Sequence, residues 1–339
     1  MIAMPEGHQR PTIDLVARQA NVSKTTVSRF LNGKFEFMSE ETRRRIQRVV
    51  DELNYRPSQS ARSLKSKRSG LIGVIVADIG SPFSSILVKA IGDLCNELGF
   101  HMIIADADEN PAKEREALES LVGDERVEGL IVNTTGYNDD TLVELGKHCP
   151  IVIVEREMET LVFDTVVSDS YSMTMEAMRH MDQASFDAIA FFTQPIGRNS
   201  ARRNRLQAYL DFWRANRTGD AYVFESPTSD VQRDLQAFLA ASQGRSRSIF
   251  SVNGVTTLAI LKSAAALGVR IPADIGLCGY DDWAWAALIG PGITTIDHPT
   301  YQVGSLAAKR LVARIMGAKG KPKRIKVPSA LHVRGSTAR

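Results

Sequence analysis

Residues 12–53 carry apolar side chains at the three- and four-residue spacing of one face of an α-helix. Three helices are predicted: one after Thr12, which is a suitable N-cap, one over residues 23–32, and one that begins near Ser39. Asn21 tolerates the left-handed backbone conformation of a tight turn, so the first two helices can be joined closely. The pattern therefore predicts a helix-turn-helix completed by a third amphipathic helix.

The second predicted helix has two faces of different chemistry. Val27, Phe30 and Leu31 fall at positions i, i+3 and i+4, where they can be buried together. The opposite face carries basic, hydroxyl and amide side chains, namely Lys24, Thr25, Ser28, Arg29 and Asn32. This face suits a polar, anionic partner, although an ordinary solvated helix face has the same composition.

From Leu71 onwards the pattern changes to short apolar segments that alternate with amphipathic ones. The apolar segments predict strands at 71–77, 101–105, 129–133, 151–155, 165–168, 188–193, 221–224, 248–252, 276–279, 294–296 and 324–327. Helices are predicted between most of them, for example at 82–98, 113–122, 202–215, 255–267 and 302–315. The alternation indicates an α/β protein, and this number of strands predicts two lobes, each a doubly wound parallel sheet.

A linker separates the helical segment from the strands. Pro57 cannot continue a helix, and residues 58–64 could form about two helical turns but have too little apolar surface to be stable alone. We therefore predict a helix-turn-helix headpiece at 10–57, a linker at 58–68 that folds on contact, and a core at 69–339.

Charge is distributed unevenly along the chain. The net charge is only +3, but residues 1–70 contain 14 basic and 7 acidic residues, so this region carries +7 and the remainder carries −4. Such asymmetry favours a nucleic-acid-binding module attached to a neutral or acidic domain. No apolar run is long enough to span a membrane and the N-terminus lacks the apolar core of a signal peptide, so we expect a cytoplasmic, nucleoid-associated protein.

Residues with reactive side chains do not form a recognisable catalytic or metal-binding motif. The sequence lacks the glycine-rich, nucleophile-elbow and zinc-binding motifs that would indicate an enzyme, and no cofactor or metal is expected. A transport-binding protein is a further alternative, but such a protein should carry a signal peptide and no basic headpiece, and the opposite is expected of this sequence. The three cysteines are interpreted as buried free thiols, and the six histidines as ordinary surface or core residues: Cys95, Cys149 and Cys278; His8, His101, His148, His180, His298 and His332.

Several segments together closely resemble the LacI/GalR family of transcriptional repressors. In the headpiece they are Val22 to Gly33 (VSKTTVSRFLNG), 39–43, 55–57 and 61–64. In the core they are 72–76, 81–83, 128–132, 279–282 and 293–296. The resemblance covers nearly the whole chain in order and spacing.

The resemblance implies a homodimer whose headpieces bind a palindromic operator in double-stranded DNA. It also implies a periplasmic-binding-protein-like core that holds a small effector between two lobes. Chain crossings are then expected near 166–169, 296–299 and 321–324. The first lobe would comprise about 69–166 with 298–322, and the second about 167–296 with 324–335.

The resemblance also implies individual DNA contacts. Lys24, Thr25 and Arg29 fall at the positions that read base edges, and the phosphate contacts fall on Thr12, Ser23, Thr26, Ser28 and Asn32. Leu64, with Ala61, matches the hinge that wedges into a base step from the minor groove. The alternative is that these two residues pack on the core.

For the effector pocket, the resemblance implies Asp281 as a hydroxyl acceptor, Arg205 as an effector-binding arginine, and Asn253 and Phe83 as further contacts. Two departures add Trp283, beside Asp281, and Arg202, from a segment crowded with arginines. Arginines favour a carboxylate or phosphate on the ligand. The amino-acid sequences of segments 129–134 and 290–294 are most similar to those of ketogluconate-responsive members of the family, so an acidic sugar such as 2-ketogluconate is the expected effector. A neutral sugar as the effector, or action as an activator, are the alternatives.

Overall fold

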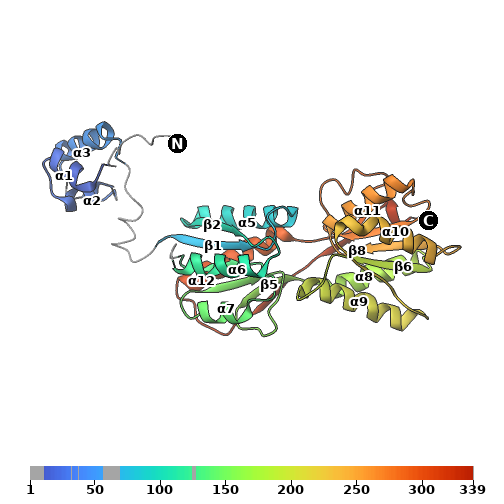
Figure 1. Ribbon diagram of the computed structural model, residues 1–339. Coiled ribbons are helices and arrows are strands. Elements are labelled where there is room, and N and C mark those ends of the chain that lie inside the picture. The colour runs from blue at the N-terminus through green and yellow to red at the C-terminus, as the bar shows by residue number, and fades with distance from the viewer. Residues whose placement is uncertain (1–10, 32, 37, 56–68, 124–126, 339) are drawn as a thin grey trace, which may run out of the picture. The chain divides into compact units, whose positions relative to one another are not determined.

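The computed structural model describes residues 11–31, 33–36, 38–55, 69–123 and 127–338 (Figure 1). The chain divides into two compact units, 1–69 and 70–339.

The first unit contains the three predicted helices, α1 (Ile13–Gln19), α2 (Lys24–Leu31) and α3 (Glu40–Glu52). The Thr12 hydroxyl accepts a hydrogen bond from the Leu15 N–H at 3.3 Å, and the Ser39 hydroxyl accepts one from the Thr42 N–H at 3.2 Å. Asn21 has φ 48°, in the left-handed region. The predicted caps and the turn between α1 and α2 are therefore confirmed, because local hydrogen bonding is enough to fix them.

The apolar stripes of the three helices meet in one small core. Val16 of α1, Val27 of α2 and Ile46 of α3 are completely buried in it, and Tyr55 is also a buried member of this core. Packing of these apolar stripes holds the three helices together, because no single helix has enough apolar surface to be stable alone.

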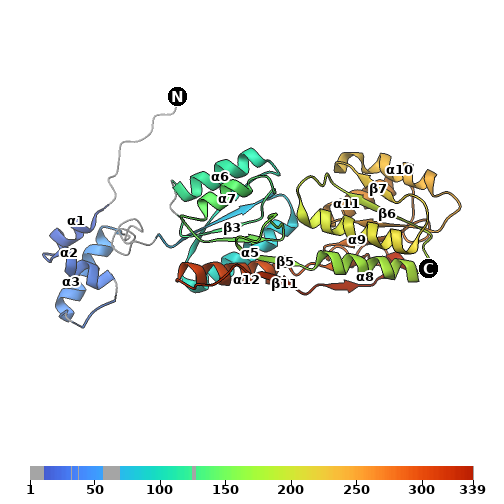
Figure 2. The same cartoon turned by 90° about the horizontal axis from the view of Figure 1, so that it is seen from below.

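Two six-stranded sheets make up the second unit. The first has the strand order β11-β5-β4-β3-β1-β2 and is entirely parallel. Its strands are β1 (Leu71–Val76), β2 (His101–Asp106), β3 (Leu130–Val132), β4 (Ile151–Val154), β5 (Asp164–Ser168) and β11 (Arg324–Val327). Its helices are α5 (Pro82–Leu98), α6 (Pro111–Gly123), α7 (Asp139–Leu145) and α12 (Thr300–Ile315). In Figure 2, α6 and α7 cover one face of this sheet and α5 and α12 the other.

The second sheet has the order β12-β10-β9-β8-β6-β7. Its strands are β6 (Ala188–Thr193), β7 (Tyr222–Glu225), β8 (Arg247–Ser251), β9 (Gly276–Tyr280), β10 (Thr294–Asp297) and β12 (Ala330–His332). The helices α8 (Ser170–Gln183) and α9 (Ser200–Asn216) cover one face, and α10 (Val231–Ala241) and α11 (Gly254–Leu267) the other. Short 3₁₀ helices lie at Thr228–Asp230 and Gly335–Thr337. The predicted fold class, two doubly wound α/β lobes after a helical headpiece, is confirmed.

The last part of the chain corrects the expected lobe boundaries. β11 was expected in the second lobe, but it pairs in parallel with β5 at the edge of the first sheet, and Val327 is buried in that lobe's core. The third crossing therefore lies at 328–329, after β11. β12, which the apolar pattern did not predict, pairs antiparallel with β10. Short edge strands bury few residues, so their sequences carry little information about which sheet they join.

Within the described residues of the core, the chain thus passes between the lobes three times, after β5, between β10 and α12, and after β11. The three cysteines are buried and free, as predicted. Among the residues that the structure describes, no helix is both long and apolar enough to cross a membrane.

Candidate functional site

The outer face of α2 presents the side chains that were expected to read DNA. Lys24, Thr25 and Arg29 are exposed, while Val27 and Phe30 on the other face are buried. The exposed face therefore has the predicted composition and is accessible within the headpiece.

The polar groups around α2 already have local partners. Ser23 caps the helix: its hydroxyl accepts the Thr26 N–H at 3.1 Å and lies 2.9 Å from the Thr26 hydroxyl. The Lys24 ammonium lies 2.5 Å from Asp14 of α1, and both side chains are exposed. An exposed ion pair contributes at most about 1 kcal/mol, so a phosphate or base can displace Asp14 at small cost. Asn32, Ala61 and Leu64 lie outside the described residues.

A cavity of about 80 Å³ lies between the two lobes of the core. Five of the six predicted effector-binding residues line it: Phe83, Arg202, Arg205, Asn253 and Asp281. Its other lining residues are Ser81, Asn133, Glu155, Arg156, Asn199, Ala201 and His298. The structure thus brings together side chains that are widely separated in the sequence.

The cavity residues are placed by the ends of strands and the beginnings of helices. Asn253 is the N-cap of α11: its Oδ1 accepts the Thr256 N–H at 2.9 Å, and its Nδ2 donates to Gln194 at 2.8 Å. Glu155 directly follows β4 and Asp281 directly follows β9, with φ 59° and 71°. Left-handed backbone is unfavourable for such residues and is typical of functional positions. In open α/β sheets ligands bind at these carboxyl ends of the strands.

Four charged side chains form a buried network that joins the lobes. Arg205 of α9, in the second lobe, lies 3.2 Å from Glu155 of the first lobe, and both are almost completely buried. His298, on the second chain crossing, lies 3.0 Å from Glu155 and 3.3 Å from Asp281. The contact of His298 Nε2 with Glu155 is not aligned as a hydrogen bond, so it is an ion-pair contact.

The pKa values of the network follow from these contacts. Burial alone would lower the pKa of His298, but attraction to Glu155 and the hydrogen bond to Asp281 raise it to about 9. Burial alone would raise the pKa values of Glu155 and Asp281, but the charges of His298 and Arg205 hold both below their usual range. At neutral pH the network therefore contains two cations and two anions.

Arg205 is held by several further contacts. Its Nη1 donates to the Val252 carbonyl at 2.8 Å, and its Nε donates to the Ser170 hydroxyl at 3.4 Å. The guanidinium carbon lies 3.6 Å above the centre of the Tyr280 ring. Arg205 is thus fixed in place before any ligand arrives.

A second cavity, of about 390 Å³, adjoins the first and shares Asn199 and Arg202 with it. Glu109, at its edge, forms two hydrogen bonds with Arg156, of 2.8 and 2.5 Å, and lies 3.5 Å from Arg202. Burial and repulsion from Arg156 lower the pKa of Arg202 to about 10, with Glu109 opposing them. The second cavity is thus lined by two arginines, Arg198 and Arg202, and by one carboxylate, Glu109.

Trp283 does not line either of these cavities, in contrast to the expectation. Its ring packs against the backbone of Gly254, where an added Cβ would lie 2.5 Å from a ring carbon, and it contacts Trp285 edge-on at 6.1 Å. Close packing on the helix start has turned this side chain away from the ligand side.

The six histidines were interpreted as surface or core residues, and His298 is indeed buried, but its place at the centre of the charged network was not predicted. Glu155, Arg156 and Glu109 were also missed. Each follows an apolar strand and so resembles any polar residue at a strand end. Their left-handed or loop backbones leave no periodic signal in the sequence.

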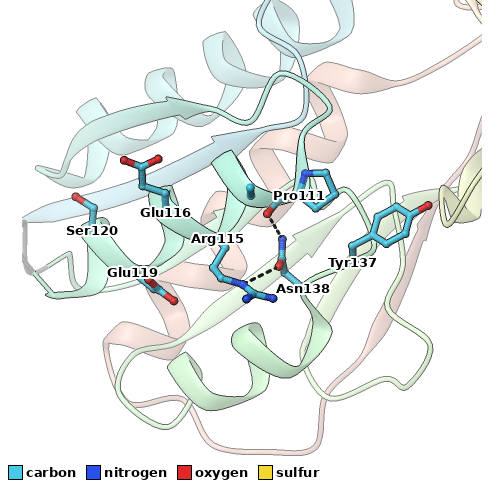
Figure 3. A pocket seen from close by; sticks show the side chains of 8 residues that line it. Pro111, Arg115, Glu116, Glu119, Ser120, Tyr137 and Asn138 are labelled. Atoms are coloured by element: carbon cyan, nitrogen blue, oxygen red, sulfur yellow. Dashed lines mark hydrogen bonds between the residues drawn. The ribbon is translucent and has the colours of Figure 1, made fainter.

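A more open pocket of about 710 Å³ lies on the first lobe, beside α6 (Figure 3). Figure 3 shows Asn138 there, donating to the Pro111 carbonyl at 2.8 Å and accepting from Arg115 at 3.3 Å. All of its lining residues come from one lobe, so a ligand there would not bridge the lobes. The described residues contain no group of three His, Cys, Asp or Glu side chains that could hold a metal ion.

Two family descriptions match the sequence. "Bacterial regulatory proteins, lacI family" matches residues 12–58, and "Periplasmic binding protein-like domain" matches residues 178–337. The two matches fall on the helical headpiece and on the core.

Similar proteins extend over the full length. The HTH-type transcriptional regulator KdgR of Bacillus subtilis (strain 168) is 38% identical over 330 residues, covering 96% of this chain and 97% of that protein. The HTH-type transcriptional regulator PtxS of Pseudomonas aeruginosa is 37% identical over 329 residues, covering 97% and 96%.

Among solved structures, the Lac repressor dimer bound to operator and the anti-inducer ONPF has a TM-score of 0.85 at 24% identity, covering 98% of this chain and 100% of that one. A LacI family transcriptional regulator from Enterococcus faecalis V583 with bound ribose has a TM-score of 0.71 at 24% identity, covering 79% and 98%. At these identities the likeness shows a shared fold.

Proposed function

Because the chain belongs to the LacI family of bacterial regulatory proteins, we propose that it is a homodimeric repressor whose affinity for a palindromic operator is controlled by a sugar acid. Membership of this family makes it a DNA-binding transcriptional regulator, as the sequence predicted in preference to an enzyme. It acts in the cytoplasm, on the chromosome.

The exposed face of α2 reads the operator in the major groove. Arg29 can donate two hydrogen bonds to the edge of a guanine, Lys24 can reach the same acceptors, and Thr25 offers a hydroxyl and a methyl group. All three side chains are exposed in the headpiece, which supports this assignment. Phosphate contacts are assigned to hydroxyl and amide groups near α1 and α2, which position the headpiece without reading bases: Thr12, Ser23, Thr26, Ser28 and Asn32.

The linker completes the DNA contact. Leu64, with Ala61, is assigned as a minor-groove wedge, because an apolar side chain inserted into a base step kinks the duplex and brings more protein surface onto DNA. The two wedges of a dimer must lie at a fixed separation, so the linker couples the cores to the operator.

The effector binds between the lobes of the core. The observation that carries this assignment is the cavity lined by Arg156, Arg202 and Arg205 together with Asn253 and Asp281. Guanidinium groups bind carboxylates in pairs of hydrogen bonds, and amide and carboxylate oxygens bind hydroxyls. This combination fits a polyhydroxylated acid such as 2-ketogluconate.

Ligand binding controls DNA binding through the relative position of the lobes. The contact of Glu155 with Arg205 joins the lobes within the cavity, so a ligand there acts on both. A ligand shifts the equilibrium between two lobe arrangements only to the extent that its affinities for them differ. The affinity for the operator changes with this shift.

The proposal is tested by electrophoretic shift of the promoter DNA next to the gene, with and without 2-ketogluconate, gluconate, 2-keto-3-deoxygluconate, glucose and ribose. We expect retardation of the DNA and a change in operator affinity of about tenfold or more with one of the acids. Absence of retardation under every ligand condition contradicts operator binding. A response to a neutral sugar alone contradicts the acidic effector.

A further inference from the structure

The charged side chains that line the two adjoining cavities do not balance. The acidic residues are Glu109, Glu155 and Asp281, and the basic residues are Arg156, Arg198, Arg202, Arg205 and His298. With His298 protonated, the cationic side chains therefore exceed the carboxylates by two. The location of this excess decides where an anionic ligand is held.

The inner group of charged side chains, which consists of Arg205, His298, Glu155 and Asp281, already has no net charge. Arg205 and His298 face Glu155 and Asp281 at 3.0 to 3.3 Å, and all four side chains are buried. A ligand carboxylate directed at Arg205 would bring a third negative charge into this group, or would have to separate Arg205 from Glu155. Leaving a buried charge without its partner is costly.

The excess of positive charge lies in the outer group of charged side chains, around Glu109, Arg156 and Arg202. Glu109 serves two guanidinium groups, since it is hydrogen-bonded to Arg156 and lies 3.5 Å from Arg202. Arg202 otherwise donates to neutral oxygens, the Pro195 carbonyl at 2.7 Å and the Gln194 amide at 2.9 Å. One carboxylate is thus shared by two cations.

Arg198 does not compete for this role. Its guanidinium lies 5.3 Å from the centre of the Tyr137 ring, and the side chain is exposed at the edge of the outer cavity. Solvent and the ring face can stabilise its charge without a ligand. Arg202, in contrast, has a side chain only 12% exposed, so its charge is little screened by water.

We propose that Arg202, together with Arg156, receives the carboxylate of the acidic effector, whereas Arg205 serves to fix Glu155 and the lobe contact. This inference rests on the proposed function. Glu109 then competes with the effector for the same two guanidinium groups and sets the affinity for acids. The hydroxyl groups of the ligand extend into the inner cavity, towards Asn253 and Asp281.

Calorimetric titration of the full chain with 2-ketogluconate, gluconate and glucose tests this division of roles. Arg202→Met should weaken binding of the acid by about tenfold or more without changing the affinity for glucose. Glu109→Gln should tighten binding of the acid by roughly threefold or more, because it removes the competing charge but keeps a hydrogen-bond acceptor for Arg156. A misfolded variant cannot produce this gain.

Two matched controls accompany these variants. Arg203→Met changes the neighbouring arginine of α9, which is exposed and lines neither cavity, and Glu176→Gln neutralises an exposed glutamate of α8 that lines none of the described pockets. Both should bind the acid as the wild type does.

The outcomes separate the inference from the proposed function. If the wild type binds an acid but Arg202→Met binds it equally well, or Glu109→Gln binds it more weakly, the assignment of the carboxylate is wrong and the sugar-acid function stands. If the wild type binds none of the acids, the proposed effector class is itself wrong.

Discussion

The buried His298 should make the stability of the core depend on pH in a defined window. Its side chain is 3% exposed and lies between the carboxylates of Glu155 and Asp281, with the Phe83 ring stacked on it at 5.1 Å and the Tyr280 ring edge-on at 6.1 Å. Its pKa is raised from 6.5 to about 9 in the folded core. The folded state therefore binds the proton more tightly than the unfolded chain does.

The size of the effect follows from that difference. One pKa unit corresponds to about 1.4 kcal/mol, so His298 contributes about 3 kcal/mol to the free energy of unfolding. The contribution is complete below pH 6.5 and is lost as the pH rises through 9. On the acid side, the pKa of Glu155 falls from 4.5 to about 2, so its contribution is lost as the pH falls below 4.5. Stability should be greatest between pH 4.5 and 6.5.

Other groups affect the alkaline limb of the wild type and of a His298 variant equally. Burial raises the pKa values of the three cysteines from 9.0 to about 11 or 12, so ionisation of the thiols in the unfolded chain lowers stability from about pH 9 upwards. Burial lowers the pKa of His180, so its effect on stability lies at lower pH than that of His298.

Urea unfolding at pH 6.5 and pH 9, followed by the fluorescence of the three tryptophans, measures the effect. Trp213, Trp283 and Trp285 all belong to the second lobe, which contributes Asp281 and Arg205 to the network. Between the two pH values the wild type should lose about 3 kcal/mol more than His298→Asn, because the thiols contribute equally to both proteins. His298→Asn should also be less stable than the wild type at pH 6.5. Equal losses in both proteins would refute the role of His298.

Four further predictions concern other parts of the molecule. Arg29→Ala should weaken operator binding by about 1–3 kcal/mol and relax base preference at one position, as measured by shift assays with substituted operators. Asp281→Ala should leave operator affinity unchanged but abolish the effector response in the same assay. Ile46→Ala should cost the headpiece about 2–5 kcal/mol, so that circular dichroism shows early loss of helix while the core still binds its ligand. Gly136→Ala should weaken ligand binding by roughly tenfold in calorimetry, since its Cβ would lie 2.7 Å from the Arg198 carbonyl of the facing lobe and Gly136 has φ 87°.

Local patterns in the sequence were sufficient to predict much of the fold. α5 was predicted with its observed ends because Pro82 begins it and Gly99, with φ 76°, ends it. β6 and β11 were also predicted with their observed ends. The chain position of β11 was right but its lobe was wrong, since the partner of an edge strand depends on backbone pairing that its few side chains do not specify.

The candidate site was predicted less completely. Arg205 and Asp281 were placed by resemblance, and the structure brings both to one cavity. Trp283 was included because it follows Asp281 in the sequence, but neighbouring residues after a strand can point in different directions. His298 was taken for an ordinary histidine because the six histidines are scattered along the chain, and its partners Glu155 and Asp281 are distant from it in the sequence.

The sequence by itself determined the elements and the exposed face of α2, because caps, periodicity and turn residues act over a few positions along the chain. Only the tertiary structure decided which charges meet. Glu155 and Arg205 lie 50 residues apart in the sequence, and both are buried, Glu155 directly after β4 and Arg205 within α9. Charges at that separation become partners only when two lobes close on each other and exclude water, which makes their interaction strong.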